Sequence, residues 1–266
     1  MNIPLALAVV EVRFPESAPL TDDQVANLKK SLNGRFPIYK HEIRNGFTST
    51  VNYELGTVAN SPIVEVLHHF LARSLQTGAT LTSKSLVVET TDYKSWLELK
   101  KMFVETLGAV NDIVHLDGYQ RVGCRYIDEF RLEGADDWAS IISPGLVAPS
   151  WNAGPQSTKL EAQMFQAIYS TDTVGITSTL RFGQMSGPPV IGSSDYLVRT
   201  NLPGESTFFL LDTDCAWQLP QGLPVPPVSI QEISQLSEQL HDLISSAFLM
   251  VTTSKFQTSI EAASMK

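Results

Sequence analysis

The sequence predicts an α+β protein built from two similar halves, each a mainly antiparallel sheet covered by amphipathic helices. Three features of the 266 residues support this fold class. Several segments alternate apolar and polar residues with the period of two that marks a half-buried strand. Two segments, 96–110 and 233–251, carry apolar residues at helical spacing. Between them, a stretch rich in Gly, Pro, Ser and Ala forms a connection at 133–157, which leaves 1–132 and 158–266 as the two halves.

The first half begins with a predicted strand and a capped helix. In "ALAVVEVRF" the apolar residues fall on one face, and Glu11 and Arg13 fall on the other. Thr21 followed three residues later by Gln24 is the capping-box pattern of a helix start. Thr, Val and aromatic residues then dominate 46–91, which predicts mostly strands.

The rest of the first half contains one ambiguous segment and one clear helix. In "SPIVEVLHHFLARSL" the pair Ser61–Pro62 resembles a helix start, whereas the following "QTG" resembles a hairpin turn, and we favour a strand. The next helix has Trp96 and Phe103 on its apolar stripe. Beyond it, "YQRVGCRYIDEFRL" is predicted to be a strand.

The second half is predicted to contain a hairpin, two further strands and a long helix. The hairpin turns around Thr171–Asp172, and the further strands cover "DYLVRT" and "ESTFFLLDTD". Ser229 followed by Glu232 predicts a capped start for the last helix, whose wide apolar face must lie across a sheet or a partner helix. The segments before the two long helices, "SLVVETTDY" and "TFFLLDTDC", are similar in pattern. An internal duplication and a coincidence of pattern are both compatible with this similarity.

Charge and composition argue against several classes of function. The net charge of −9 argues against general nucleic-acid binding, which needs clustered Lys and Arg. The two cysteines, Cys124 and Cys215, lie far apart in no metal-like spacing, which fits a reducing compartment. The first apolar run lacks the positive start of a signal peptide, and no run approaches the ~20 residues of a membrane span. We therefore expect a cytoplasmic protein without membrane contact, and we expect no cofactor.

The segment "RVGCRYIDEF" raises the main question about a site, because it places two arginines around a glycine in a predicted strand. Alternation puts one set of residues on a polar face: Arg121, Gly123, Arg125, Ile127 and Glu129. It puts the other set on the face expected to pack on the helix that carries Trp96: Val122, Cys124, Tyr126, Asp128 and Phe130.

The two arginines have two interpretations. The gap at Gly123 could hold a phosphate or a carboxylate between two guanidinium groups. Alternatively, if the first strand is a neighbour, a cross-strand ion-pair ladder forms from Arg13, Arg125, Glu11 and Glu129. Gly123 then only relieves crowding or marks a bulge. We favour the ladder or an interface role, and the candidate ligand or interface residues are Arg13, Arg121, Gly123, Arg125, Tyr126 and His241.

Other candidates are weaker. Asp212 and Asp214 share a face at the expected end of a strand and could hold a divalent ion, although Asp is also common where strands enter turns. His241 flanks the apolar stripe of the last helix and is better explained as a packed histidine than as a general base. Nearby arginines could lower the pKa of Cys124, but its place on the core face favours a buried, inert thiol. The segment "SGPPVIGSSDYLVR" either folds over a groove or a partner or is a solvated connection, and we favour the connection.

The strand "RVGCRYID" resembles the R-x-G-x-R-Y-I-N strand of an uncharacterised, sporadically distributed prokaryotic family of proteins of about 260 residues. The segments "VEVRF", "YKSW", "LLDTD" and "LHDLISSAF" are similar to that family in the same order. The chain departs from it at Asp128, where Asn is usual, and at Cys124, where an aliphatic residue is more common. The resemblance implies an α+β fold and a role in an accessory system such as phage defence or toxin neutralisation, and it supplies no catalytic residue.

These observations predict a non-catalytic protein-interaction or sensing component of a prokaryotic accessory system, in defence or as an antitoxin-like protein. Its expected partner is a protein, encoded nearby, and homodimerisation is also expected. The alternative is an enzyme or small-ligand binder that recognises a phosphate or nucleotide through Arg13, Arg121 and Arg125.

Overall fold

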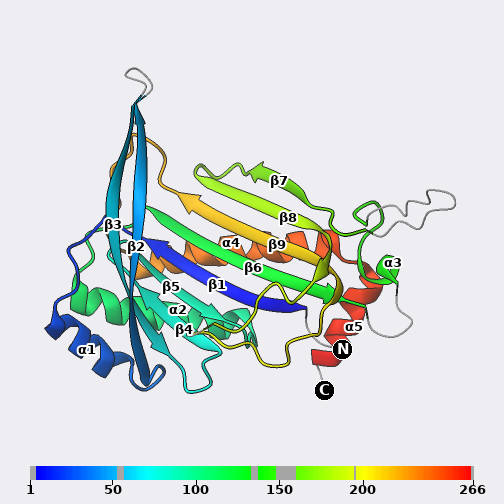
Figure 1. Cartoon of the computed structure of the whole chain (residues 1–266), viewed down its shortest axis with the longest axis horizontal. Coiled ribbons are helices and arrows are strands. Elements are labelled where there is room, and N and C mark those ends of the chain that lie inside the picture. Colours follow the sequence, from blue (N-terminus) through cyan, green and yellow to red (C-terminus); the bar gives the residue numbers. More distant parts are fainter. Residues whose placement is uncertain (1–3, 53–56, 133–136, 148–159, 195, 265–266) are drawn as a thin grey trace.

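The computed structural model describes residues 4–52, 57–132, 137–147, 160–194 and 196–264 and confirms the α+β fold class. Within these residues, nine strands form one antiparallel sheet in the order β2-β3-β4-β5-β1-β6-β9-β8-β7 (Figure 1). The strands are β1 (Leu5–Arg13), β2 (Ile38–Asn52), β3 (Thr57–Leu71), β4 (Thr77–Leu81), β5 (Ser85–Thr90), β6 (Arg121–Arg131), β7 (Phe165–Ser170), β8 (Ile176–Gly187) and β9 (Ser206–Gln218). The helices are α1 (Asp22–Leu32), α2 (Trp96–Val114), α3 (Trp138–Ile141), α4 (Ile230–Val251) and α5 (Ser254–Ser264).

The two halves of the chain share this one sheet and follow the same path through it. In each half the first strand, β1 or β6, lies in the middle of the sheet, and the chain then crosses to the outer edge. It returns strand by strand until β5 pairs with β1, or β9 with β6, and a long helix follows. The halves meet where β1 pairs antiparallel with β6.

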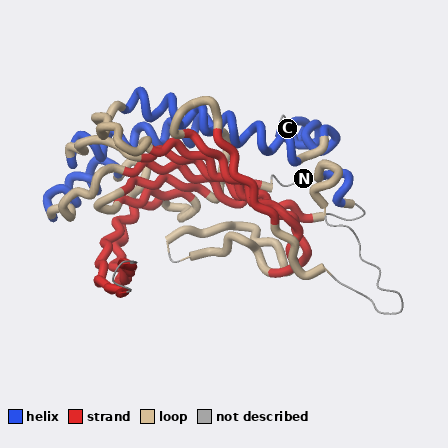
Figure 2. The backbone as a smooth tube through the Cα atoms, turned by 90° about the horizontal axis from the view of Figure 1, so that it is seen from above, coloured by secondary structure: helices blue, strands red, loops and turns tan. Residues whose placement is uncertain are grey.

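The core lies between the sheet and the two long helices, which cover one face of it (Figure 2). The alternation predicted for the first strand is present, because Ala6, Ala8, Val10 and Val12 are all buried on this face. The core-facing residues of β6 were expected to pack on the helix that carries Trp96, which is α2, and this contact differs in the structure. Val122, Cys124 and Tyr126 face α4 rather than α2, because α4 packs on β6 and β9 whereas α2 packs on β5 and α1.

The predicted helix starts are present. The Thr21 N–H donates to Oε1 of Gln24 at 3.0 Å, and the Gln24 N–H donates to Oγ1 of Thr21 at 3.2 Å, which completes the capping box of α1. The Glu232 N–H donates to Oγ of Ser229 at 3.3 Å at the start of α4. None of the helices in the described ranges is long and apolar enough to span a membrane.

The ambiguous segment near His68 is a strand, as favoured, and belongs to a hairpin that extends beyond the sheet (Figure 1). β2 and β3 pair along their whole length, but β3 pairs with β4 only from His68 to Leu71. The backbone beyond these four residues therefore forms a two-stranded arm. The predicted connection at 133–157 lies mostly outside the described residues, apart from 137–147, which include α3.

The prediction of a strand in "DYLVRT" was wrong, because residues 196–200 lie in a loop that crosses the face opposite the long helices (Figure 2). This loop, residues 188–194 and 196–205, is called the strap below. Its backbone bonds at Val198, where the N–H donates to the carbonyl of Leu75 between β3 and β4 at 2.7 Å, and the carbonyl accepts from the Thr91 hydroxyl at 2.7 Å. Tyr196 stacks on His69 with ring centroids 4.5 Å apart. The strap joins β8 to its antiparallel neighbour β9, as the favoured hairpin connection requires, and residues 192–194 and 200–202 are exposed. Its middle, with Leu197 buried, lies against the sheet.

Candidate functional site

The face of the sheet opposite the long helices carries the predicted arginines, and we call it the polar face. Register places the polar-face residues of neighbouring strands side by side. Gly123 of β6 lies between Glu11 of β1 and Ala216 of β9, and Arg125 is opposite Asp214. The strand β1 is therefore the neighbour of β6 that the ladder interpretation requires.

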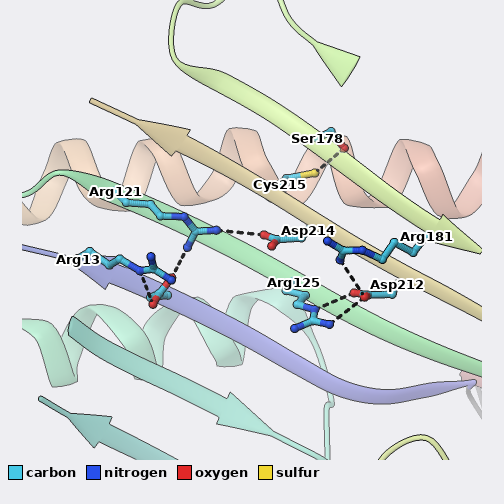
Figure 3. Close-up of polar contacts among 9 residues, drawn as sticks. Arg13, Arg121, Arg125, Ser178, Arg181, Asp212, Asp214 and Cys215 are labelled. Atoms are coloured by element: carbon cyan, nitrogen blue, oxygen red, sulfur yellow. Dashed lines mark hydrogen bonds and ion pairs between the residues drawn. The ribbon is translucent and has the colours of Figure 1, made fainter. Parts of the chain in front are cut away.

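The first ion-pair network centres on Arg121 (Figure 3). Its Nη1 contacts the Glu11 carboxylate, and its Nη2 donates to Asp214 at 3.2 Å. Nε of Arg13 donates to the same Glu11 at 2.8 Å. A Cβ added at Gly123 would overlap the Arg121 guanidinium, so the glycine lets this side chain lie flat across the strand. The gap that the sequence suggested for an anion is filled by Arg121 itself.

The second network centres on Asp212, whose side chain is only 7% exposed. Nε and Nη2 of Arg125 donate to its two oxygens at 2.7 and 2.8 Å, and Nη1 of Arg181 donates at 3.3 Å. The hydrogen bond to Asp212 raises the pKa of Arg125 above its ordinary value. The expected ladder of Arg13, Arg125, Glu11 and Glu129 is present only in part. Arg13 pairs with Glu11, whereas Arg125 binds Asp212 of β9, two residues from its register partner Asp214.

Glu129 has a different role, which joins the strap to the sheet. Its side chain is 0% exposed and accepts from Nε of Arg131 and Nη1 of Arg199, each at 2.6 Å. The Val190 N–H donates to the same carboxylate at 3.2 Å. Arg199 and Val190 both belong to the strap. Glu129 thus binds two guanidinium groups and a backbone donor in a buried position.

Tyr126 and His241 lie on the other side of the sheet, away from the arginines. The Tyr126 hydroxyl lies 3.2 Å from the Tyr93 hydroxyl and 3.3 Å from Nδ1 of His241. The His241 ring stacks on Trp96 at 4.4 Å, and burial lowers its pKa below the ordinary value. The structure therefore separates the candidate residues into two groups, with His241 packed between helices.

Asp128 is a buried carboxyl that was not among the candidate site residues. It lies on the helix side of β6 and is 5% exposed. Within the described part of the chain, no basic side chain or hydrogen-bond donor reaches it, and burial raises its pKa to about 8. The carboxyl is therefore mostly protonated at neutral pH. Its signal in the sequence is a carboxylate within the core-facing set of a strand, which usually needs a partner.

The cysteines are not activated by the arginines. Burial raises the pKa of Cys124 far above its ordinary value and that of Cys215 to about 11. The Sγ of Cys215 lies 3.0 Å from the Ser178 hydroxyl (Figure 3). Both thiols are protonated at neutral pH, because desolvation outweighs the effect of Arg121 on Cys124.

Asp212 and Asp214 lie in the middle of β9 and not at its end, which corrects the expected position. Their carboxylates are ion-paired with arginines, and no group of three or more potential metal ligands occurs in the described ranges. A cavity of about 290 Å³ lies elsewhere, between α2, the start of β4 and the residues that follow α1, and its wall contains Arg35, Asp92, Lys94 and Glu98. None of the polar-face arginines lines it.

Comparison with known proteins adds no family. No family model matches the chain, and no curated protein matches it. The resemblance carried by "RVGCRYID" stays a prediction, and the function has to be argued from the geometry alone.

Proposed function

We propose that the chain is a non-catalytic protein-interaction module that binds a protein partner through its polar face. The proposal is supported by one observation above all. Arg125 and Arg181 are held in place by Asp212, yet their side chains are 44% and 39% exposed. Arginine is enriched at the energetic centres of protein interfaces. Fixed and exposed guanidinium groups on a curved sheet suit such a role.

The two arginines keep donors for a partner after pairing with Asp212. Arg125 uses Nε and Nη2, and the described residues offer no partner to its Nη1. Arg181 uses Nε for Gln166 and Nη1 for Asp212. Because both side chains are already ordered, binding avoids an entropy cost of about 0.5–1.5 kcal/mol for each. Neutral acceptor oxygens of a polar protein segment, such as backbone carbonyls, fit these donors without displacing Asp212.

The alternative of a phosphate or nucleotide site is weaker on the same geometry. The two networks contain four arginines, Arg13, Arg121, Arg125 and Arg181, and three carboxylates, Glu11, Asp212 and Asp214. An anion would have to displace a carboxylate that is already held by two hydrogen bonds from Arg125. The proposal also includes the setting that the resemblance to the prokaryotic family implies. In that setting the chain is a sensing or neutralising component of an accessory system.

We expect replacement of either exposed arginine to weaken the partner complex. The chain is co-expressed with the products of its neighbouring genes, and the co-purified protein is titrated against Arg125→Ala and Arg181→Ala. Loss of a central interface arginine should raise Kd about tenfold or more. The matched control is Arg35→Ala, which removes an arginine that is 43% exposed and paired with Glu105 away from the polar face. Wild-type Kd values for both polar-face variants would contradict the proposed surface.

A further inference from the structure

Within the described residues, the strand β7 forms an open edge of the sheet, next to β8, which carries Arg181. It pairs with β8 and is the last strand in the sheet order (Figure 1). An edge strand presents a row of unpaired N–H and C=O groups to its surroundings. Another β-strand can satisfy these groups, because its own N–H and C=O groups form hydrogen bonds with them.

The hydrogen bonds that flank β7 identify which backbone groups face outward. The Gln163 N–H donates to the Gln184 carbonyl at 2.7 Å, and the Thr171 N–H donates to the Ile176 carbonyl at 3.3 Å. Antiparallel bonding alternates residue by residue, so the odd-numbered residues between them bond to β8. The backbone groups of Gln166, Ile168 and Ser170 therefore point away from the sheet.

The side chains of β7 lack the features that usually protect an edge. The strand "FQAIYS" contains no charge, proline or glycine. Phe165, Ile168 and Tyr169 are 50%, 67% and 49% exposed. Natural edge strands are normally protected from pairing by charged residues, proline or a bulge. In a chain of net charge −9, an uncharged strand also lets two copies approach without bringing like charges together within it.

The strand is complementary to itself in the antiparallel direction. Phe165, Ala167 and Tyr169 alternate onto one face of the sheet, where Phe165 also contacts Phe182 with ring centroids 5.7 Å apart. A two-fold axis through Ala167 places each Phe165 opposite Tyr169 of a second copy, and each Ile168 opposite Gln166. Cross-strand aromatic pairs of this kind stabilise antiparallel sheets. The outward backbone groups of Gln166 and Ile168 then bond to each other across the axis.

We propose that a second copy of the chain pairs its own β7 with this edge, which joins two nine-stranded sheets into one continuous sheet with two-fold symmetry. An isologous contact of this kind closes after two subunits and satisfies both edges at once. Arg125, Asp212 and Arg181 of each copy lie on β6, β9 and β8 and outside the contact. Gln166, which accepts from Nε of Arg181 at 3.0 Å, is the residue that the two proposed surfaces share.

Sedimentation velocity of the full chain tests the dimer. We expect a mass of two 29.3 kDa chains at micromolar concentration. Ile168→Lys puts a charge at the centre of the edge and should raise the dimer Kd at least 30-fold. The matched control is Thr177→Lys, which puts the same charge at an exposed position of β8. A wild-type chain that stays monomeric at 100 µM, or a dimer that Ile168→Lys does not weaken, overturns the proposal.

A cross-link tests the register independently of any loss of folding in the lysine variant. Residues on the two-fold axis face their own copies, with Cα atoms about 4.5 Å apart in a non-hydrogen-bonded pair. Ala167→Cys should therefore give a disulfide-linked dimer under mild oxidation, because this spacing lies within the range for a disulfide. Thr177→Cys should not. Equal cross-linking by the two variants contradicts the axis through Ala167.

Discussion

We expect Asp128→Asn to make the protein more stable at neutral pH, by an amount that depends on pH. The Asp128 carboxyl has an ordinary pKa of 3.8 and a folded-state pKa of about 8. Between these values the folded protein keeps a proton that the unfolded chain releases, so stability falls as pH rises. The cost of this burial at neutral pH is about 4 kcal/mol. Asparagine has no such titration and removes the cost.

The pH dependence of the difference between the two proteins is the diagnostic result. Urea unfolding of both proteins is followed from pH 4 to pH 8. The advantage of Asp128→Asn should be near zero at the acidic end, grow as pH rises, and level off near pH 8. Asp112→Asn removes an exposed carboxylate from α2 and should show no comparable trend. Parallel stability profiles for Asp128→Asn and the wild type would show that the carboxyl is not held protonated.

We expect Glu129→Gln to destabilise the protein by about 3–5 kcal/mol, because it leaves two guanidinium groups buried without a counter-charge. Arg131 and Arg199 each place a nitrogen 2.6 Å from the Glu129 carboxylate, and each side chain is only 13% exposed. Glutamine keeps the shape of the side chain, removes the charge and replaces one of the two acceptor oxygens with an NH2 donor that would face a guanidinium. The measurement is the free energy of unfolding in urea.

The control for Glu129 is an ion pair at the surface. Glu105 is 49% exposed and pairs with Arg35, so Glu105→Gln should cost less than about 1 kcal/mol. Because Glu129 also holds the strap, its variant should increase hydrogen exchange at Val190 and Val198 more than in the centre of β6. A loss below about 1 kcal/mol, with unchanged exchange in the strap, would contradict the role of Glu129 as an anchor.

Local patterns predicted much of the fold. The alternation in β1 and β6 and the capping residues Thr21 and Ser229 each depend on a few neighbouring residues, so they could be found without knowing which strands pair. The segment of Tyr196 and Leu197 shows the limit of this reasoning. Its pattern resembles that of a strand, but the segment is a loop in which Tyr196 stacks on His69 and the Leu197 side chain is buried.

The polar face was predicted in part. The placement of Arg121 and Arg125 opposite the core, among carboxylates, followed from the period of two. The identity of their partners did not, because Asp212 lies 87 residues from Arg125 and Asp214 lies 93 residues from Arg121. These contacts depend on β9 pairing with β6. The pairing of Arg199 with Glu129 was missed for the same reason, since the strap crosses the sheet without a regular pattern of its own.

Titration of the chain with pyrophosphate and ATP by calorimetry at low ionic strength tests the central claim, that carboxylates of the chain itself neutralise the polar-face arginines. Low ionic strength is the condition most favourable to an anion site, because screening is weakest there. We predict no saturable binding at ligand concentrations up to the millimolar range. Saturable micromolar binding that is lost in Arg125→Ala and retained in Arg35→Ala would contradict the claim and favour the ligand-binding alternative.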